Sequence, residues 1–467
     1  RGTNIEADLY DALKAEAGIP GNLTTESLKS PRFVYLDLRD YPDITSLRGL
    51  TYCTNLRVLN ISGLKIKSGI NEIATLRKLQ ALIARDCDLN SLSDGGPSVL
   101  KNMADLKLLD LSNNNFENLD SVLDPDVKYG KLNEVYLANN KLTDISGLNR
   151  APALNVLVLS GNGLESNDVT QLASFKFLTY LSLANNQITD ISMLSGLKYL
   201  IELRLQHNNI TNIKPLAGLV YLEALYLGHN NINVDVGFLN TLAKLKTLYL
   251  NDNSIDQLTM LSALRSINVS NNNIISLAVL DRYSDTLTEV YAENNKLTSI
   301  GFVSEMTNLQ VLMLSGNNVF AANSSDLSGL TQLHILTLSG VPLNDLSFLN
   351  GIEALIWLDV SNCGLKSFTV YSKTLCVDDT TGESFYQVTN YNDNVASIAT
   401  QKKYLTYLNV SGNDFSVNTE GLSFGGAGPI GFNSLNILDK LNVLYADNIN
   451  YTIVPSTLFA MMSQLRY

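Results

Sequence analysis

Residues 178–222 read LTYLSLANNQITDISMLSGLKYLIELRLQHNNITNIKPLAGLVYL and contain two almost identical units, the second beginning 22 residues after the first. Their shared pattern is LxxLxLxxNxIxxI, with leucine at positions 0, +3 and +5 and asparagine at +8. The Leu-x-Leu core alternates with the period of two that a β-strand with one buried face requires, and the rest of the unit loses this alternation. Each unit therefore predicts one coil of a short strand and an irregular or 3₁₀ return.

The same pattern recurs along most of the 467 residues and is that of a leucine-rich repeat. Position +8 holds asparagine in eleven coils, where its amide can bond backbone groups of neighbouring coils. We predict an α/β solenoid, a leucine-rich repeat horseshoe with a parallel concave sheet, a short 3₁₀ or irregular convex side and an N-terminal helical cap. Seventeen coils start at Phe33, Leu56, Leu79, Leu106, Leu132, Leu154, Leu178, Leu200, Leu222, Leu245, Leu264, Leu287, Leu309, Leu333, Leu355, Leu405 and Leu441.

We divide the chain into four segments. Residues 5–17 place apolar side chains at helical spacing, and residues 1–32 are expected to cap the first coil, which would otherwise expose its core. Repeats fill residues 33–368. Residues 369–404 lengthen one step to 50 residues and combine turn signals with alternating strand-like residues, so we predict a projecting hairpin. Residues 405–467 are degenerate C-terminal repeats with a glycine-rich insertion.

Composition and motifs exclude several functions. The formal net charge of −12, without a long basic run, disfavours nucleic acid or an anionic membrane as partner. No apolar run approaches the roughly 20 residues of a membrane helix, and no signal peptide is visible. Because the chain begins with Arg1 rather than Met, we expect a processed or trimmed product.

Motifs of catalysis are also missing. The sequence holds no metalloprotease, nucleophile-elbow or Walker motif, so we predict a protein that is not an enzyme and carries no cofactor. Residues 426–431 do match G-x-G-x-x-G, but they follow no strand-like run and open no helix. A flexible insertion explains them better than a dinucleotide site.

The four cysteines do not make a disulfide framework. Cys87 and Cys363 replace the +8 asparagine in two coils that are twelve coils apart. At about 4.8 Å per strand they are separated by on the order of 60 Å, so they cannot pair with each other. We expect each to be a small buried thiol. A disulfide between Cys363 and Cys376 stays open as an alternative.

Two histidines and an aspartate share position +7 in consecutive coils. His207, His229 and Asp252 would stand about 5 Å apart in a row, and zinc accepts such ligands. Position +7 elsewhere holds mostly Asn, Gly and Asp, which tolerate a left-handed backbone. We therefore favour a turn role for these residues over a metal site.

Positions +2 and +4 of each strand are expected to point outward from the sheet. Large aromatic side chains gather in these two columns, where they supply contact area and are enriched in binding hot spots. One stripe across six consecutive coils would be formed by Tyr180, Arg204, Tyr226, Tyr249 and Tyr291. The structural alternative is that tyrosine favours strands and neighbouring rings stack for stability. The candidate ligand-binding residues are Tyr136, Tyr180, Glu202, Arg204, Tyr226, Tyr249, Tyr291, Met313 and Trp357.

The DIS-x-L repeats at residues 144–148 and 190–194, with the leader NIEADLYDALKAEAG at residues 4–18, resemble the internalin-type repeats and cap of bacterial surface proteins. The resemblance covers nearly the whole chain. It implies an extracellular or cell-surface bacterial protein that adheres to a host or environmental macromolecule. The two insertions and the missing wall-anchoring tail depart from that family.

The leading hypothesis is a monomeric module that binds a protein or peptide through the concave face, in adhesion or host interaction. Glycan binding is the second hypothesis, because stacked aromatic rings beside Asp, Asn and Glu suit sugars equally well. A passive spacer between other domains and the cell is the third, and a cytosolic scaffold is the most distant.

Overall fold

A computed structural model describes residues 5–18, 20–259, 261, 264–320, 322–416, 422–424, 432–450, 459 and 462–466. The G-x-G-x-x-G stretch at 426–431 lies outside the described residues. The chain divides into two compact units. Unit 1 comprises residues 1–232 and 241–244, and unit 2 comprises residues 233–240 and 245–467.

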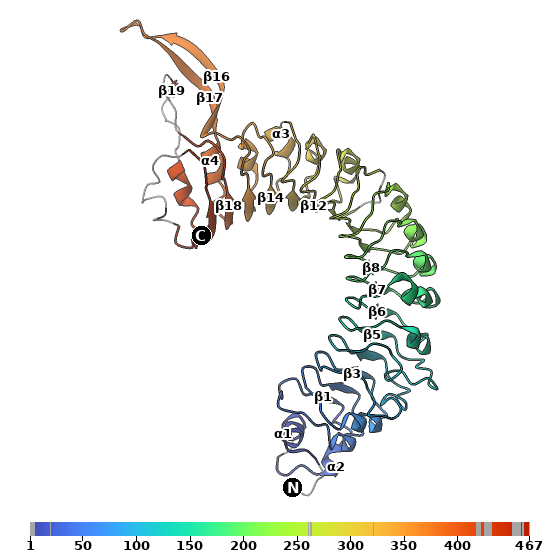
Figure 1. The fold of residues 1–467 in the computed structure, drawn as a ribbon. Coiled ribbons are helices and arrows are strands. Elements are labelled where there is room, and N and C mark those ends of the chain that lie inside the picture. Colours follow the sequence, from blue (N-terminus) through green and yellow to red (C-terminus); the bar gives the residue numbers. More distant parts are fainter. Residues whose placement is uncertain are drawn as a thin grey trace. The chain divides into compact units, whose positions relative to one another are not determined.

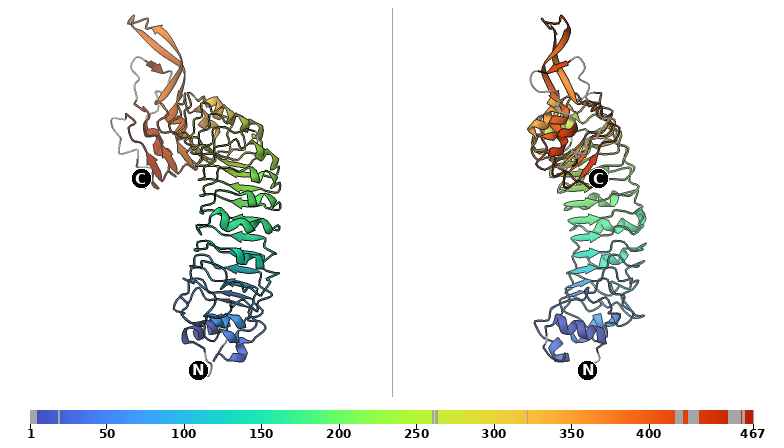
Figure 2. Two further views of the ribbon diagram at one scale, coloured as in Figure 1. Left: turned by 45° about the vertical axis from the view of Figure 1, so that its right-hand side comes forward. Right: turned by 90° about the vertical axis from the view of Figure 1, so that its left-hand side faces the viewer.

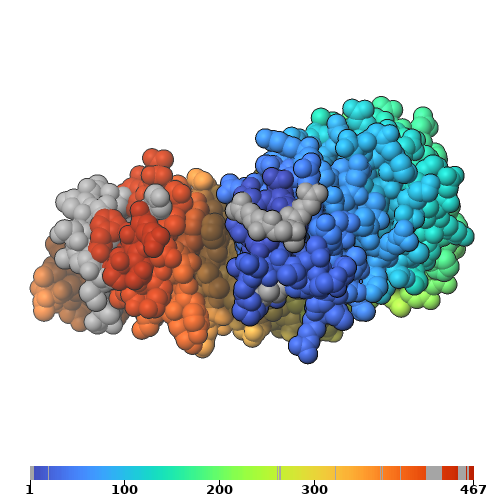
Figure 3. Space-filling model, turned by 90° about the horizontal axis from the view of Figure 1, so that it is seen from below, coloured from blue at the N-terminus to red at the C-terminus, as the bar shows by residue number. Residues whose placement is uncertain are grey.

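Unit 1 begins with two helices, the first of which lies within residues 5–17 as expected. Helix α1 (Ala7–Glu16) buries an apolar face, and the short helix α2 (Thr25–Leu28) follows. Thr24 and Ser27 form a capping box, in which each hydroxyl accepts a hydrogen bond from the other residue's backbone N–H. Figure 3 shows the described residues of this N-terminal part in blue. In the part of the chain that is described, no helix is long and apolar enough to cross a bilayer.

Parallel three-residue strands follow, and consecutive strands of unit 1 pair in order with the +3 residues opposite one another. The central residue of each strand is buried, because it points into the core between the sheet and the return side of each coil. Figure 1 shows the strands along one side of the unit and the 3₁₀ turns along the other. The strands are β1 (Tyr35–Asp37), β2 (Val58–Asn60), β3 (Ala81–Ile83), β4 (Leu108–Asp110), β5 (Glu134–Tyr136), β6 (Val156–Val158), β7 (Tyr180–Ser182), β8 (Glu202–Arg204) and β9 (Ala224–Tyr226).

Unit 2 repeats this architecture, again with parallel strands paired in order. Strand β15 pairs directly with β18 although the 50-residue step separates their coils. The predicted leucine-rich repeat solenoid with a parallel sheet is therefore confirmed in each unit. The strands are β10 (Thr247–Tyr249), β11 (Ser266–Asn268), β12 (Glu289–Tyr291), β13 (Val311–Met313), β14 (Ile335–Thr337), β15 (Trp357–Asp359), β18 (Tyr407–Asn409) and β20 (Val443–Tyr445).

Most return segments contain a short helix, as coils of about 22 residues require. The 3₁₀ helices are η1 (Leu50–Tyr52), η2 (Ile70–Thr75), η3 (Ser146–Arg150), η4 (Ser166–Ser174), η5 (Ser192–Gly196), η6 (Lys214–Gly218), η7 (Gly237–Thr241), η8 (Ala278–Tyr283), η9 (Gly301–Val303), η10 (Ser347–Gly351) and η11 (Phe432–Ile437). One return holds the α-helix α3 (Ser324–Leu327).

The +8 asparagines form a ladder of side-chain hydrogen bonds. The Nδ2 of Asn208 donates to the carbonyl oxygens of Leu183 (2.9 Å) and Leu205 (3.0 Å), and its Oδ1 accepts from the amide of Ile188 (3.0 Å). Each of these amides therefore ties its own coil to the preceding one. The same carbonyl of Leu183 also accepts from Asn186, so the ladder is continuous.

Cysteine can fill a rung of this ladder. The Sγ atoms of Cys87 and Cys363 each donate to a carbonyl oxygen of the preceding coil at 3.1 Å. Burial raises the pKa of the Cys87 thiol to about 11, so it stays protonated and able to donate. All four cysteines are free. The alternative Cys363–Cys376 disulfide is wrong, because Cys376 lies on a hairpin strand and contacts Gln387 instead.

The long insertion combines a hairpin with a helix that returns to the core. Strands β16 (Phe368–Val377) and β17 (Ser384–Asp393) pair antiparallel, and β19 (Leu422–Phe424) adds to β17 in parallel. The hairpin extends away from the coils of unit 2 in every view (Figures 1 and 2). Helix α4 (Asn394–Ala399) follows directly, with Asp393 as its N-cap.

Asn394 anchors this insertion to the repeats, and its replacement gives the first prediction. It is fully buried, accepts from the amide of Leu346 (2.9 Å) and donates to the carbonyl of Lys366 (3.0 Å). Asn394→Ala is expected to lower the free energy of unfolding by about 2 kcal/mol, because it leaves buried backbone groups unpaired. Urea unfolding of the full chain, followed by circular dichroism, measures this. The exposed Asn350→Ala serves as control, and an equal loss in both variants would contradict the anchoring role.

Candidate ligand-binding surface

The sheet face of unit 1 carries a compact group of candidate residues. Tyr180 and Glu202 lie opposite each other at position +2 of the neighbouring strands β7 and β8. Arg204 and Tyr226 lie opposite each other at position +4 of β8 and β9. Glu202 Oε1 accepts from Arg204 Nε at 2.7 Å, and the guanidinium carbon of Arg204 lies 4.7 Å from the centre of the Tyr226 ring. We call these four residues the central cluster. All four are half-buried, with their core-facing neighbours completely covered.

In the central cluster, the Tyr180 hydroxyl stays neutral and the Arg204 guanidinium stays charged. Burial raises the pKa of Tyr180, so its hydroxyl remains neutral and able to donate. Burial lowers the pKa of Arg204, but the hydrogen bond to Glu202 and the nearby tyrosines outweigh it and leave that pKa raised. A fixed cation thus stands between a carboxylate and an aromatic ring.

Tyr136 lies on the same face, with β6 between it and the central cluster. Its hydroxyl donates to Glu134 Oε2 at 3.0 Å, and burial together with that carboxylate raises the pKa of Tyr136 to about 12. Its partner in the +4 row is Asp110, which is 1 % exposed and held by the guanidinium of Arg85. The region around Tyr136 is therefore a packed polar network.

In unit 2 the candidate residues fall into two groups. The rings of Tyr249 and Tyr291 meet edge-on at 6.2 Å between centroids, and burial raises the pKa of Tyr291 to about 12. Ser266 between them donates to Glu289 Oε2 at 2.7 Å. Met313 follows Tyr291 in the +4 row.

The second group surrounds the tryptophan. The Trp357 and Tyr407 rings stack face to face, with centroids 3.5 Å apart and planes 7° from parallel, and Tyr445 lies 5.8 Å from Tyr407. Tyr407 and Tyr445 are not among the candidate residues predicted from the sequence. The signal that could have found the contact is the shared +2 position of Trp357 and Tyr407 in coils that are consecutive once Leu405 restarts the repeat.

The histidines are turn residues, as predicted. His207, His229 and Asp252 have φ of 57°, 55° and 56°, which is the left-handed region. The two imidazole rings stack with centroids 4.1 Å apart. Within the described ranges, no group of three or more His, Cys, Asp or Glu side chains is arranged to hold a metal ion.

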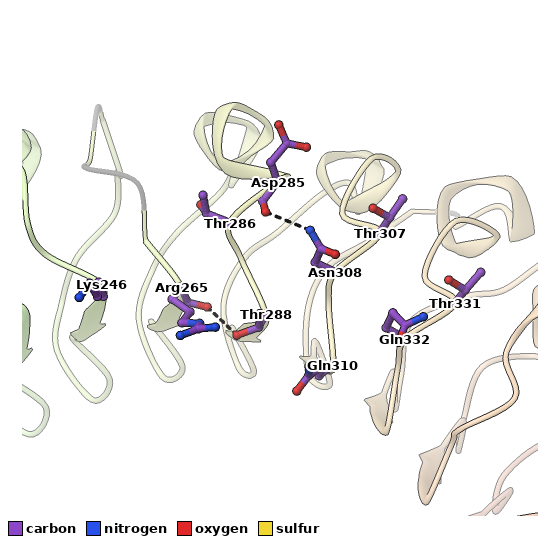
Figure 4. A pocket seen from close by; sticks show the side chains of 10 residues that line it. All are labelled: Lys246, Arg265, Asp285, Thr286, Thr288, Thr307, Asn308, Gln310, Thr331 and Gln332. Carbon is purple, nitrogen blue, oxygen red and sulfur yellow. Dashed lines mark hydrogen bonds between the residues drawn. The ribbon is translucent and has the colours of Figure 1, made fainter.

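One hollow of about 760 Å³ lies on the flank of unit 2, just before the strands (Figure 4). Asn308 Nδ2 donates to the carbonyl of Asp285 (3.0 Å), and the Thr288 hydroxyl donates to the carbonyl of Arg265 (3.2 Å). These two side chains therefore bond to the backbone of the preceding coil, and no aromatic residue is among those that line the hollow. Its lining residues are Lys246, Arg265, Asp285, Thr286, Thr288, Thr307, Asn308, Gln310, Thr331 and Gln332.

Comparison with known families and structures agrees with this geometry. The family described as "Leucine Rich repeats (2 copies)" matches residues 176–218 and 222–263, and the family described as "Leucine Rich repeat" matches residues 401–423. The crystal structure of an internalin (InlF) from Listeria monocytogenes is 28% identical, with a TM-score of 0.62, over 70% of this chain and 94% of that one. The chain is an internalin-like leucine-rich repeat protein.

Two further structures share the fold with this internalin-like chain. A leucine-rich repeat protein of Leptospira interrogans is 21% identical, with a TM-score of 0.64, over 96% of this chain and 99% of that one. The ectodomain of the Arabidopsis thaliana receptor kinase GASSHO1/SCHENGEN3, in complex with CASPARIAN STRIP INTEGRITY FACTOR 2, is 19% identical, with a TM-score of 0.63. That match covers 89% of this chain and 53% of the ectodomain. A search of curated proteins found no match.

Proposed function

We propose that the internalin-like chain is a non-enzymatic module that binds a protein or peptide through the outward face of its sheet. We place it outside the cell or on a bacterial surface, in adhesion or host interaction, as a monomer. The observation that carries this proposal is the central cluster of unit 1, formed by Tyr180, Glu202, Arg204 and Tyr226. The candidate residues of unit 2, from Tyr249 to Trp357, are proposed as a second contact region.

Three properties of the central cluster favour a protein ligand. Tyrosine and arginine dominate binding hot spots, because they offer large amphipathic surfaces. The ion pair to Glu202 and the contact with Tyr226 already fix Arg204, so binding costs little ordering entropy. Next to them, Gln206 Oε1 is the sole buried side-chain oxygen or nitrogen without a hydrogen-bond partner among the described residues. A donor on a ligand would satisfy it after a side-chain rotation.

The relatives support the class of partner and leave its identity open. The GASSHO1/SCHENGEN3 ectodomain holds CASPARIAN STRIP INTEGRITY FACTOR 2, so a scaffold of this fold can present a ligand-binding surface. At 19% identity the likeness concerns the fold alone. The similarity to InlF, in contrast, is what leads us to a bacterial surface and to adhesion.

Glycan binding is less well supported by the geometry. Sugars stack on open faces of aromatic rings, but Trp357 and Tyr407 cover each other at 3.5 Å. The ring faces of Trp357 and Tyr407 that stack on each other are therefore closed to a sugar.

The test begins with a surface plasmon resonance screen of the purified chain against receptor ectodomains and a glycan array. For any protein ligand found, Arg204→Ala and Tyr226→Ala are each expected to weaken binding about tenfold or more, since both are hot-spot types held in place before binding. Tyr249→Ala examines the contact region of unit 2 in the same way.

Tyr35→Ala is the matched control, because Tyr35 is an exposed tyrosine of the same sheet face on β1, far from the central cluster in sequence. Its affinity should equal that of the unchanged chain. A ligand whose affinity is unaffected by both Arg204→Ala and Tyr226→Ala, or binding to glycans alone, would rule out the proposed function.

A further inference from the structure

A second surface of unit 1 is exposed and apolar. Phe177, Tyr199 and Tyr221 each lie immediately before the first leucine of a coil, in three consecutive coils, and Ile201 and Val220 lie beside them in the sequence. Their exposed fractions run from 43 to 60%. We call these five residues the apolar flank. They lie outside the outward +2 and +4 columns that hold the central cluster.

The repeat does not require apolar residues at these positions. The residue before the first leucine is polar in coils two to five (Asn55, Lys78, Asp105 and Lys131), and it is the small Ala153 in coil six. Core packing does not explain the apolar flank either, because its side chains remain in water. Clusters of exposed apolar side chains mark interaction sites more often than scattered single ones do.

The apolar flank is also ordered. The rings of Tyr199 and Tyr221 stack with centroids 6.0 Å apart and planes at 25°, and Lys244 Nζ lies 4.5 Å from the centre of the Tyr221 ring. Such stacking holds both rings in place before a partner arrives, which lowers the entropy cost of binding.

Lysines surround the apolar flank. Lys176, Lys198 and Lys244 are exposed beside it, and Gly196 leaves room for the ammonium group of Lys176, whose Nζ would lie 2.6 Å from any added Cβ there. Glu223 is the acidic residue in the same rows, and it is half-buried. In a chain with a net charge of −12, this is a local basic surface.

We propose that the apolar flank is a docking site for a short acidic segment of a partner protein that carries aromatic or aliphatic side chains. The lysines would pair with its carboxylates, and the stacked tyrosines would cover its apolar side chains. Three coils about 4.8 Å apart span about 10 Å, the length of three or four extended residues. The site is separate from the sheet face, so the chain could hold two partners at once.

Other occupants fit less well. In a two-fold contact with a second copy, the lysines around one flank would face the same lysines on the other, which is repulsive. An anionic bilayer would attract three lysines but repel a chain whose net charge is −12.

The experiment uses a random-peptide phage library selected on the full chain, followed by fluorescence anisotropy with the enriched peptides. These peptides are expected to combine Asp or Glu with aromatic or aliphatic residues and to bind more weakly as salt rises. The double variant Tyr199→Ser/Tyr221→Ser and the single variant Lys198→Glu should each weaken binding about tenfold or more. All three residues are exposed, so circular dichroism should show an unchanged fold.

Arg204→Ala separates this proposal from the proposed function, since it alters the sheet face and should leave peptide binding to the apolar flank unchanged. Enriched peptides that lack acidic residues, or that bind the flank variants as tightly as the unchanged chain, would overturn the proposal. So would self-association in analytical ultracentrifugation that the double variant abolishes, or flank-dependent sedimentation with phosphatidylserine vesicles.

Discussion

Asn208→Ala is expected to lower the free energy of unfolding by about 3 kcal/mol. Asn208 is 6% exposed, and its Oδ1 is the acceptor for the amide of Ile188. The carbonyls of Leu183 and Leu205 keep a second donor, from Asn186 and Asn230, so the principal loss is a buried amide without a partner. The cavity left by the shortened side chain adds to this cost.

Urea unfolding of the full chain measures the loss, and amide hydrogen exchange should show faster exchange at Ile188. Asn209→Ala is the matched control, because this neighbouring asparagine is exposed. Asn208→Cys should cost less than Asn208→Ala, since Cys87 shows that a thiol can donate to the preceding coil. Equal stability of Asn208→Ala and Asn209→Ala would refute the structural role of the ladder.

Arg85→Met is expected to lower the free energy of unfolding by about 2 to 3 kcal/mol. Its guanidinium contacts Asp110 Oδ2 through two nitrogens, and the remaining contact of that carboxylate is the amide of Ser112 at 3.1 Å. Removing the arginine leaves a carboxylate that is 1% exposed without its counter-charge, and breaking one side of a buried ion pair is costly. Because the arginine is itself about half exposed, solvent screening makes this loss smaller than the loss from breaking a fully buried ion pair.

The double variant Arg85→Met/Asp110→Asn should recover much of the stability, since it removes both charges together. Arg77→Met, at an exposed arginine of the same region, provides the control in the same urea experiment. If Arg85→Met and Arg77→Met unfold at the same urea concentration, the ion pair contributes no stability.

The repeat pattern predicts the fold because it states directly which side chains are buried and which one bonds between coils. Leu203 and Leu205 are both fully buried, as the +3 and +5 positions require. Even the pairing of β15 with β18 was predictable, since Leu405 restarts the pattern after the insertion. The polar rung of Cys363 was likewise readable from its +8 position.

Contacts between outward side chains were beyond this reasoning. The repeat pattern gives the position of Arg204 on its strand but not the rotamer that turns its guanidinium toward Tyr226. It also treats every outward position as exposed, although Asp110 is covered by its neighbours. The apolar flank was not predicted, because the residues just before the first leucine of each coil take no part in the repeat pattern. The folded chain shows that these side chains are exposed and lie together.

The direct pairing of β15 with β18 also bears on protein engineering. Two coils keep their register even though the sequence between them leaves the stack, forms β16 and β17, and returns through α4. The turn between those hairpin strands, residues 378–383, is mostly exposed, and it is distant in sequence from β15 and β18. Loop tips of this kind tolerate added sequence well. A fluorescent or affinity tag grafted there should therefore leave the pairing of β15 with β18 intact.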